Sequence, residues 1–354
     1  MPLNNYDLYD LNLREKIAQL FIIGFHGNDC SPGSEVWEMI AEFKPGGVIL
    51  FDKDMVRDQP VHNIKSPEQV EELTSNLQKA SSIPLLIGVD QEGGLINRLK
   101  PEYGFPETRS HQKLGEIDDA EITFDEGKHI ASTLADVGIN TNFAPCVDLA
   151  IEKESSIIAK RERCFGESSQ QVIKHAKAYI KGHHEKKILT ACKHFPGHGS
   201  AKGDTHAGFV DVTETWNEDE LKPYTELILE ELCPVIMSSH IFNGNFDDQL
   251  PATLSSKTIR DLLRDKIGFE GIVISDDMQM RAISDHYSLS ESLKLGLEAG
   301  LDMFCFGNNL LKEQISMDNA ISAIETLVKN DAVSESRIEE SVSRILKLKK
   351  EWIN

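Results

Sequence analysis

The sequence predicts a single (β/α)8 barrel, a TIM-type α/β fold that takes up residues 1–354 as one domain. Short apolar runs alternate with longer amphipathic segments along the chain, and there are eight such runs. The runs are continuously apolar, as expected for parallel strands that are buried on both faces. No internal repeat or low-complexity linker divides the chain. A doubly wound open sheet is the main rival to the barrel.

The predicted strands are short and rich in β-branched residues. Val48-Ile49-Leu50 and Ile272-Val273-Ile274 show the typical composition. The eight predicted strands cover residues 20–25, 47–51, 84–90, 141–148, 189–195, 234–241, 271–277 and 301–307.

A helix candidate follows each strand, and many begin at a serine or asparagine that is suited to an N-cap. In the segment 168–186 the apolar residues recur on one helical face. We therefore expect His175, His183 and His184 on the solvated surface. The predicted helices cover residues 34–43, 66–80, 122–137, 168–186, 217–231, 256–267, 288–299, 316–329 and 334–352.

The charge balance bears on the class of partner. Lysine and arginine number 37 and aspartate and glutamate 58, which gives a formal net charge of −21. Such a chain is a poor match to nucleic acid or to an anionic membrane surface, so we expect neither partner. A small carbohydrate ligand remains compatible with this charge.

The cellular location is predicted from the lack of a secretory signal, a membrane span and paired cysteines in the sequence. Residues 1–20 show no basic start followed by an apolar run, and no apolar run approaches the roughly 18 residues of a membrane span. The six cysteines include no C-x-x-C pair, which favours reduced, buried thiols over disulfides or a zinc-cysteine site. We expect a soluble, cytoplasmic protein.

Ionisable residues stand at the carboxyl ends of five predicted strands, where barrels of this kind build their active sites. An aspartate at a strand end can equally be the N-cap of the next helix, and this alternative is open for Asp148 and Asp277. His240 can equally be a hydrogen-bonded structural histidine. The strand-end groups are Asp90, Asp148, Lys193 with His194, His240, and Asp276 with Asp277.

The segment 193–206 combines three glycines and a proline with two lysines, an aspartate and three histidines, so we expect a loop that carries catalytic groups. Retaining glycoside hydrolysis needs one group that attacks the anomeric carbon and another that protonates the leaving oxygen. Asp276 can supply the first function and His206 the second. Asp204, two residues earlier, can orient the imidazole of His206.

A metal site is the competing interpretation of this loop. His194 and His198 are four residues apart, a spacing that places two ligands together on a helix. Pro196 and Gly197 lie between them and make a helix there unfavourable. We therefore expect no metal ion and no cofactor in the reaction.

The motifs resemble those of glycoside hydrolase family 3 and, within it, the β-N-acetylglucosaminidases of the NagZ type. The similarity runs in the family's order from about residue 12 to residue 310. The matching segments are Val89-Asp90-Gln91-Glu92-Gly93-Gly94 with Arg98, Asn142-Phe143-Ala144-Pro145 with Asp148, Arg163-Cys164-Phe165-Gly166, Lys193-His194-Phe195-Pro196-Gly197-His198-Gly199, Asp204-Thr205-His206, Leu250-Pro251-Ala252-Thr253-Leu254-Ser255 and Ser275-Asp276-Asp277-Met278.

The resemblance implies a retaining, exo-acting β-N-acetylglucosaminidase, with peptidoglycan-derived muropeptides as one substrate class. It implies Asp276 as the nucleophile and Asp204 with His206 as the acid/base dyad. It also implies that five residues hold the sugar hydroxyls: Asp90, Arg98, Arg163, Lys193 and His194.

Two departures from the family pattern leave alternatives open. Leu95 stands where an arginine is common, and residues 200–203 replace an acidic or threonine-rich run. A β-glucosidase or β-xylosidase of the same family, a non-catalytic glycan-binding protein and a metal-dependent barrel hydrolase remain the alternatives. The segment 52–65 is expected to form an extended loop over the barrel mouth.

Overall fold

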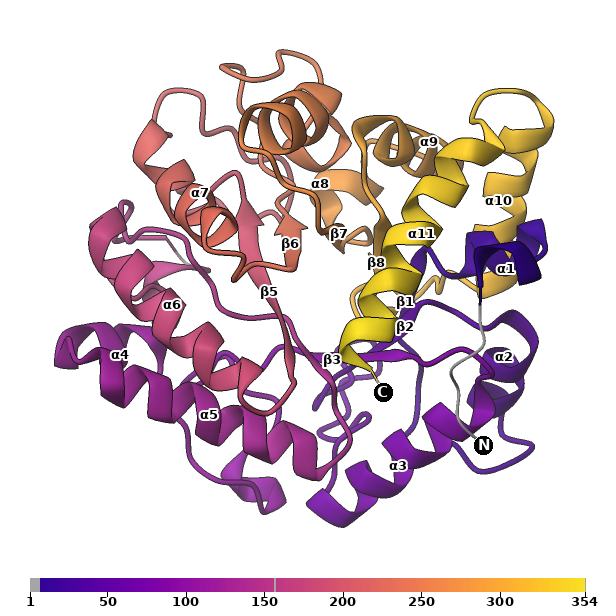
Figure 1. The fold of residues 1–354 in the computed structure, drawn as a ribbon, viewed down its shortest axis with the longest axis horizontal. Coiled ribbons are helices and arrows are strands. Elements are labelled where there is room, and N and C mark those ends of the chain that lie inside the picture. Colours follow the sequence, from indigo (N-terminus) through magenta and orange to yellow (C-terminus); the bar gives the residue numbers. More distant parts are fainter. Residues whose placement is uncertain (1–6, 156, 354) are drawn as a thin grey trace.

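The computed structural model describes residues 7–155 and 157–353. Over these residues the eight strands form one closed parallel barrel in the order β1 to β8, and helices surround it (Figure 1). Closure comes from β1, which pairs with both β2 and β8. The predicted (β/α)8 barrel is therefore confirmed, and the doubly wound open sheet is excluded.

Each of the eight predicted apolar runs contains a strand. The strand of the fourth run is shortest: it is two residues long, although the run covers 141–148. The reason lies at Pro145, which has no N–H to donate to a β-ladder. The strands are β1 (Phe21–Ile23), β2 (Gly47–Leu50), β3 (Leu86–Val89), β4 (Thr141–Asn142), β5 (Leu189–Phe195), β6 (Val235–Ser238), β7 (Ile272–Asp277) and β8 (Met303–Phe306).

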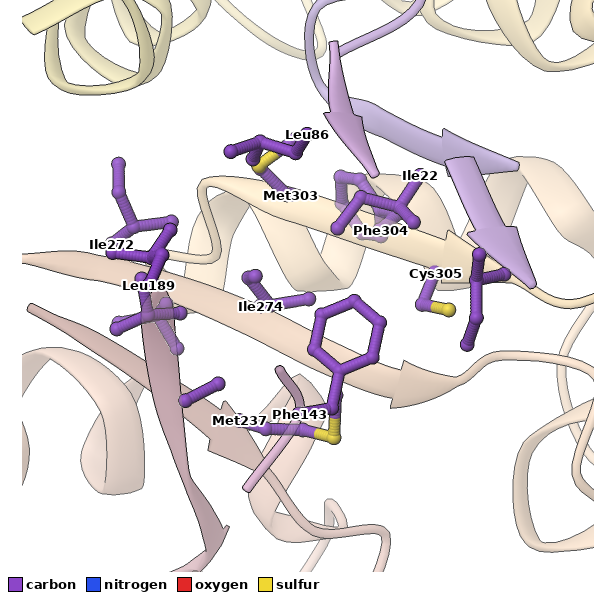
Figure 2. Close-up of a cluster of buried hydrophobic side chains, with 14 of the residues drawn as sticks. Ile22, Leu86, Phe143, Leu189, Met237, Ile272, Ile274, Met303, Phe304 and Cys305 are labelled. Atoms are coloured by element: carbon purple, nitrogen blue, oxygen red, sulfur yellow. The ribbon is translucent and has the colours of Figure 1, made fainter. Parts of the chain in front are cut away.

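The strands are buried on both faces, which explains why their sequences are continuously apolar. Figure 2 shows Ile22, Phe143, Ile274 and Phe304 in one cluster of buried side chains. Gly88 of β3 makes room for the ring of Phe143, because a Cβ at Gly88 would lie 2.5 Å from two atoms of that ring. The barrel is filled with side chains and is not a pore.

Every predicted helix segment contains a helix, and serine N-caps accept backbone hydrogen bonds at several of them, as at Ser66 and Ser168. Within the described residues three short α-helices were not predicted: α1 (Leu13–Ala18), α4 (His111–Ile117) and α8 (Arg281–Ser284). The others are α2 (Glu35–Phe43), α3 (Pro67–Ala80), α5 (Ala120–Asp136), α6 (Ser169–His184), α7 (Lys222–Leu229), η6 (Lys257–Lys266), α9 (Leu289–Ala299), α10 (Met317–Lys329) and α11 (Glu335–Trp352).

The prediction that the histidines of α6 are solvated is wrong for His175 and His183, which are completely buried. The reason is that α5 packs along α6, so a second face of the helix is covered (Figure 1). His175 Nδ1 lies 2.7 Å from Thr123 Oγ1 of α5. His183 Nε2 lies 3.0 Å from the amide nitrogen of Asn142 at the end of β4.

Two further predictions concern cysteines and membrane segments. All six cysteines are buried free thiols. Over the described ranges, none of the helices has both the length and the apolar character needed to cross a membrane.

Candidate active site

The carboxyl end of the barrel gathers polar side chains from four strands. Asp90 follows β3, Asp148 follows the fourth strand, Lys193 and His194 lie in β5, and Asp276 lies in β7. The carboxyl ends of all eight strands lie at this end of the barrel, because neighbouring strands are parallel. These residues therefore meet although they are far apart in the sequence.

Lys193 is the centre of an ion-pair network. Its Nζ lies 2.7 Å from Asp90 Oδ1 and 2.8 Å from Glu92 Oε1. Burial alone would lower the pKa of Lys193, but the two carboxylates outweigh this effect and raise it. The ammonium is therefore held charged and immobile below the mouth of the barrel.

Arg163 completes the network from the loop after the fourth strand. Its guanidinium forms a two-pronged pair with Glu92, with Nε 2.9 Å from Oε2 and Nη2 2.7 Å from Oε1. Burial alone would raise the pKa of Glu92, yet Arg163 and Lys193 hold it well below its usual range. Two cations thus balance the carboxylates of Asp90 and Glu92.

The hydrogen bonds of His194 define its tautomer. Its Nε2 lies 3.0 Å from Arg163 Nη2, which can only donate, so Nε2 is an unprotonated acceptor. Its Nδ1 lies 2.7 Å from Asp148 Oδ2 and therefore carries the proton. Asp148 also accepts from the backbone N–H of His198 at 2.8 Å. Asp148 is thus a buried partner of the β5 loop and not a helix N-cap.

Arg98 lies at the edge of this network. Its Nη2 is 3.7 Å from Asp90 Oδ2, and its Nε is 3.7 Å from Asp52 Oδ1. Lys100 contacts the other oxygen of Asp52 at 2.6 Å. The Arg98 side chain is 26% exposed, so part of its guanidinium is accessible to a ligand.

Asp276 is partly exposed near the end of β7. Burial raises the pKa of this carboxyl, but the imidazoles of His194, His240 and His206 and the backbone N–H of Asp277 lower it to about 2. The N–H of Asp277 donates to Asp276 Oδ1 at 2.8 Å. Asp276 is therefore an oriented carboxylate at neutral pH.

His240 is hydrogen bonded to the backbone of Asp277, the residue after Asp276. His240 Nε2 lies 3.0 Å from the backbone oxygen of Asp277, and its Nδ1 lies 2.9 Å from Thr253 Oγ1. His240 therefore has the hydrogen-bonded structural environment that was one of its two interpretations. Asp277 Oδ1 accepts from the N–H of Gln279 at 3.0 Å, and burial raises the pKa of Asp277 to about 6.

Asp204 and His206 form a pair on the loop after β5. Asp204 Oδ1 accepts from the backbone N–H of His206 at 2.8 Å and lies 2.9 Å from its Nδ1. Desolvation lowers the pKa of His206, but the hydrogen bond with Asp204 and the charge of Asp276 together raise it above its usual value. The His206 side chain is half exposed, so its ring is accessible at the mouth of the barrel.

The loop that carries this pair is hydrogen bonded to helix α8, which follows β7 in the chain. Thr205, between the two residues, is buried and its carbonyl accepts from the N–H of Ala282 in α8 at 3.2 Å. Since α8 begins four residues after Asp277, the same short segment positions both Asp276 and the Asp204–His206 pair.

Two carboxylates in this region were not singled out from the sequence. Glu92 lies two residues after Asp90, and this spacing of two carboxylates at a strand end could have indicated that Glu92 belongs to the site. Glu220 accepts from the N–H of Gly199 at 2.8 Å, and burial raises its pKa to about 7. No sequence signal links Glu220 to the loop, because it lies 21 residues beyond Gly199.

His194 and His198 do not form the metal site that their spacing suggested. Both ring nitrogens of His194 already have protein partners, and the ring centroids are 5.9 Å apart. Cys146 also lies beside Asp148, with its Sγ 3.2 Å from Oδ2. The Arg163 guanidinium adjoins the same imidazole, so a cation there would be repelled.

Comparison with known proteins gives a consistent result. Residues 12–348 match the glycosyl hydrolase family 3 N-terminal domain. Curated relatives named beta-hexosaminidase include one from Tolumonas auensis, 33% identical over 79% of this chain and 80% of the relative. Another, from Nitrosomonas eutropha, is 33% identical over 75% and 74%.

Solved structures with the same fold bear related names. A family 3 beta-N-acetylglucosaminidase from a Paenibacillus species is 32% identical, with a TM-score of 0.86 over 96% of this chain. A beta-N-acetylglucosaminidase from Thermotoga maritima is 28% identical, with a TM-score of 0.76 over 94% of this chain. This chain covers 62% of the Paenibacillus chain and 66% of the Thermotoga chain, so it spans about two thirds of their length or less.

Proposed function

Because the chain belongs to glycosyl hydrolase family 3, we propose that this β-N-acetylhexosaminidase removes terminal β-linked N-acetylglucosamine with retention of configuration. Cleavage proceeds in two steps through a covalent ester between the sugar and Asp276. Asp276 is the nucleophile, His206 is the acid and base, and Asp204 orients His206. The alternatives of a β-glucosidase or β-xylosidase are tested by the substrate panel below.

One observation carries the proposal. The segment that follows Asp276 is joined to the loop of His206 by the hydrogen bond from the Ala282 N–H to the Thr205 carbonyl, and the pKa of Asp276 is lowered to about 2 while that of His206 is raised. At neutral pH the first group is therefore an anion, and the second retains a proton to a higher pH than a free histidine. These are the protonation states that the first step requires.

The steps follow from those states. Asp276 attacks the anomeric carbon as the glycosidic bond breaks, and His206 gives its proton to the leaving oxygen. The now neutral His206 then takes a proton from water, and that water attacks the anomeric carbon of the ester. Asp276 leaves as a carboxylate, and His206 is again protonated. Asp204 stabilises the imidazolium by accepting from Nδ1.

The charged network beside Asp276 binds the sugar in this proposal. Lys193 pairs directly with Asp90 and is linked to Arg163 through Glu92, and the network offers both acceptors and donors to sugar hydroxyls. Arg98 and His194 complete the set of five. Since their mutual ion pairs form before substrate arrives, little ordering remains to be done on binding.

The natural substrate is proposed to be a peptidoglycan-derived muropeptide in the cytoplasm. Support for the substrate class comes from the motifs shared with NagZ-type enzymes, chiefly Asp204-Thr205-His206. Support for the location comes from six buried free thiols, a state typical of reducing compartments.

Three measurements on purified protein test the proposal. A panel of 4-nitrophenyl β-glycosides should show turnover of the N-acetylglucosaminide well above that of the glucoside and xyloside. Proton NMR should show the β-anomer as the first product. A 5-fluoro N-acetylglucosaminyl fluoride should leave its sugar on the peptide that contains Asp276, as read by mass spectrometry.

The variant Asp276→Asn isolates the nucleophile. Its neutral amide should reduce kcat by at least about 10⁴-fold, with an unchanged circular dichroism spectrum. Asp211→Asn, an exposed aspartate on the loop that follows β5, is the matched control and should retain full activity. Near wild-type turnover by Asp276→Asn, or release of the α-anomer first, would contradict the mechanism.

A further inference from the structure

Three side chains converge where the loop after β1 meets the 52–65 loop after β2. His26 Nδ1 lies 3.0 Å from His62 Nε2 and 3.1 Å from Asp54 Oδ2. His62 Nε2 lies 3.9 Å from the same carboxylate oxygen. None of the three residues belongs to the sugar-binding network or to the acid/base pair.

The charge of this cluster is poorly balanced by protein groups. Asp54 is 2% exposed, and its carboxylate faces two imidazoles. The guanidinium of Arg57 is mostly exposed and stands 3.8 Å from Asp54 Oδ2. Buried carboxylates are normally paired with a cation, and the three ligand atoms, which all lie within 4.8 Å of one another, define a position for one.

Both imidazoles are free to present a lone pair to that position. The outer nitrogens, His26 Nε2 and His62 Nδ1, are buried and have no hydrogen-bond partner within residues 7–155 and 157–353. Because the outer nitrogens are unoccupied, the proton that His26 Nδ1 donates to Asp54 Oδ2 can move to Nε2 when Nδ1 binds a metal ion. His194 differs in this respect, because Arg163 and Asp148 occupy both of its ring nitrogens.

The separations between the three inner atoms are short enough for one ion to contact all three. Ligands at about 2.0–2.2 Å from a tetrahedral zinc ion stand about 3.3–3.6 Å apart. The observed separations of 3.0, 3.1 and 3.9 Å have that average. Two imidazole nitrogens and one carboxylate oxygen are also a donor set that zinc accepts.

The backbone around the cluster is already fixed by other contacts. Asn63 donates to the carbonyl oxygens of Phe25 and Gly27 at 3.0 and 2.7 Å, which joins the two loops. The N–H of Arg57 donates to Asp54 Oδ1 at 2.8 Å and leaves Oδ2 directed to the imidazoles. The ligand atoms are thus positioned before any ion binds.

We propose that His26, Asp54 and His62 bind one zinc ion, with a water molecule as the fourth ligand. The ion holds the 52–65 loop against the loop after β1 and takes no part in glycoside cleavage. The inference therefore does not depend on the proposed function. It adds a structural metal to a chain in which the sequence predicted none.

Zinc uptake by the full-length chain tests the proposal. Protein stripped with EDTA and then dialysed against zinc should hold one zinc per chain by mass spectrometry of the metal. Zinc should also raise the melting temperature by several degrees. In Asp54→Asn and in His26→Gln, competition with a chromophoric chelator should show at least a 100-fold loss of zinc affinity.

The controls separate this site from other histidines. His129→Gln, an exposed residue of α5, and His206→Ala, which breaks the acid/base pair, should both retain one zinc per chain. Circular dichroism establishes that each variant is folded, and His62→Asn serves if either cluster variant is not. Failure of the wild-type chain to take up zinc, or undiminished affinity in folded cluster variants, would overturn the proposal.

Discussion

Arg163 and Lys193 bring two positive charges against the carboxylates of Asp90 and Glu92 below the mouth of the barrel. A buried charge that loses its partner is strongly destabilising, whereas the complete set is compensated. The same contacts leave the side chains rigid. At the scale of single residues, stability and sugar binding therefore use the same network, and substitutions within it will affect both.

His206 is the residue whose proposed role depends most on the leaving group. His206→Ala should reduce kcat/KM about 10²- to 10⁴-fold for N-acetylglucosaminides with poor leaving groups, since the departing alkoxide then lacks a proton. A 2,4-dinitrophenyl glycoside, whose phenolate leaves unaided, should keep nearly the wild-type kcat/KM. Steady-state kinetics on the two substrates give the comparison, and His129→Gln should alter neither. Equal losses on both substrates would argue against acid catalysis.

The raised pKa of His206 also predicts a pH profile for the wild-type chain. Only the protonated imidazole can donate, so kcat/KM on a poor leaving group should fall as pH rises through a pKa above 6.5. The descending limb should disappear from the His206→Ala profile. An unchanged limb in that variant would assign the titration to another group.

The raised pKa of Glu220 predicts that the stability of the fold depends on pH. Its pKa rises from 4.5 in the unfolded chain to about 7 in the fold, so the native state binds the proton more tightly. The stabilisation is complete below pH about 4.5 and is lost as pH rises through 7. Glu220→Gln keeps an oxygen acceptor for Gly199 without the charge.

Urea unfolding of Glu220→Gln at several pH values tests this prediction. Relative to wild type, the free energy of unfolding of the variant should increase by about 2 kcal/mol between pH 5 and pH 8. Glu218→Gln, an exposed neighbour, is the control and should show no such trend. A difference between Glu220→Gln and wild type that does not change with pH would contradict the assigned titration.

At the scale of elements, β3 packs closely against Phe143, which follows β4, because Gly88 in β3 has no side chain. Gly88→Ala would place a Cβ 2.5 Å from the ring of Phe143, where the surrounding barrel is filled. The variant should lose about 1–3 kcal/mol in the free energy of unfolding. Adding Phe143→Leu should recover part of that loss in urea denaturation, because the two residues are coupled. Additive losses would show that the ring is not the cause.

Helix α6 shows where a helical pattern is insufficient. Its apolar stripe predicted one buried face, toward the barrel. The helix in fact packs against α5 as well, so His175 and His183 are enclosed and hydrogen bonded to Thr123 and Asn142. The second buried face of α6 contains hydrogen-bonded polar side chains in place of apolar ones. It therefore adds no apolar periodicity from which the sequence could predict its burial.

At the scale of the whole molecule, the barrel was predictable because parallel strands buried on both faces leave continuous apolar runs. The residues at the strand ends were predictable for a related reason: parallel strands all end at one rim. Asp90, Lys193, His194 and Asp276 could be selected in this way, and the Asp204–His206 pair could be selected because its members are two residues apart.

Contacts between distant segments depended on the closed barrel itself. The tautomer of His194 is set by Arg163 and Asp148, and the anchoring of Thr205 is set by Ala282. The His26–Asp54–His62 cluster joins two loops whose histidines are 36 residues apart. The local sequence indicates which segments form strands or helices and which faces are buried. Hydrogen bonds and ion pairs depend instead on distances of a few ångströms between side chains that are far apart in the sequence. Those separations arise only when closure of the barrel places neighbouring loops side by side.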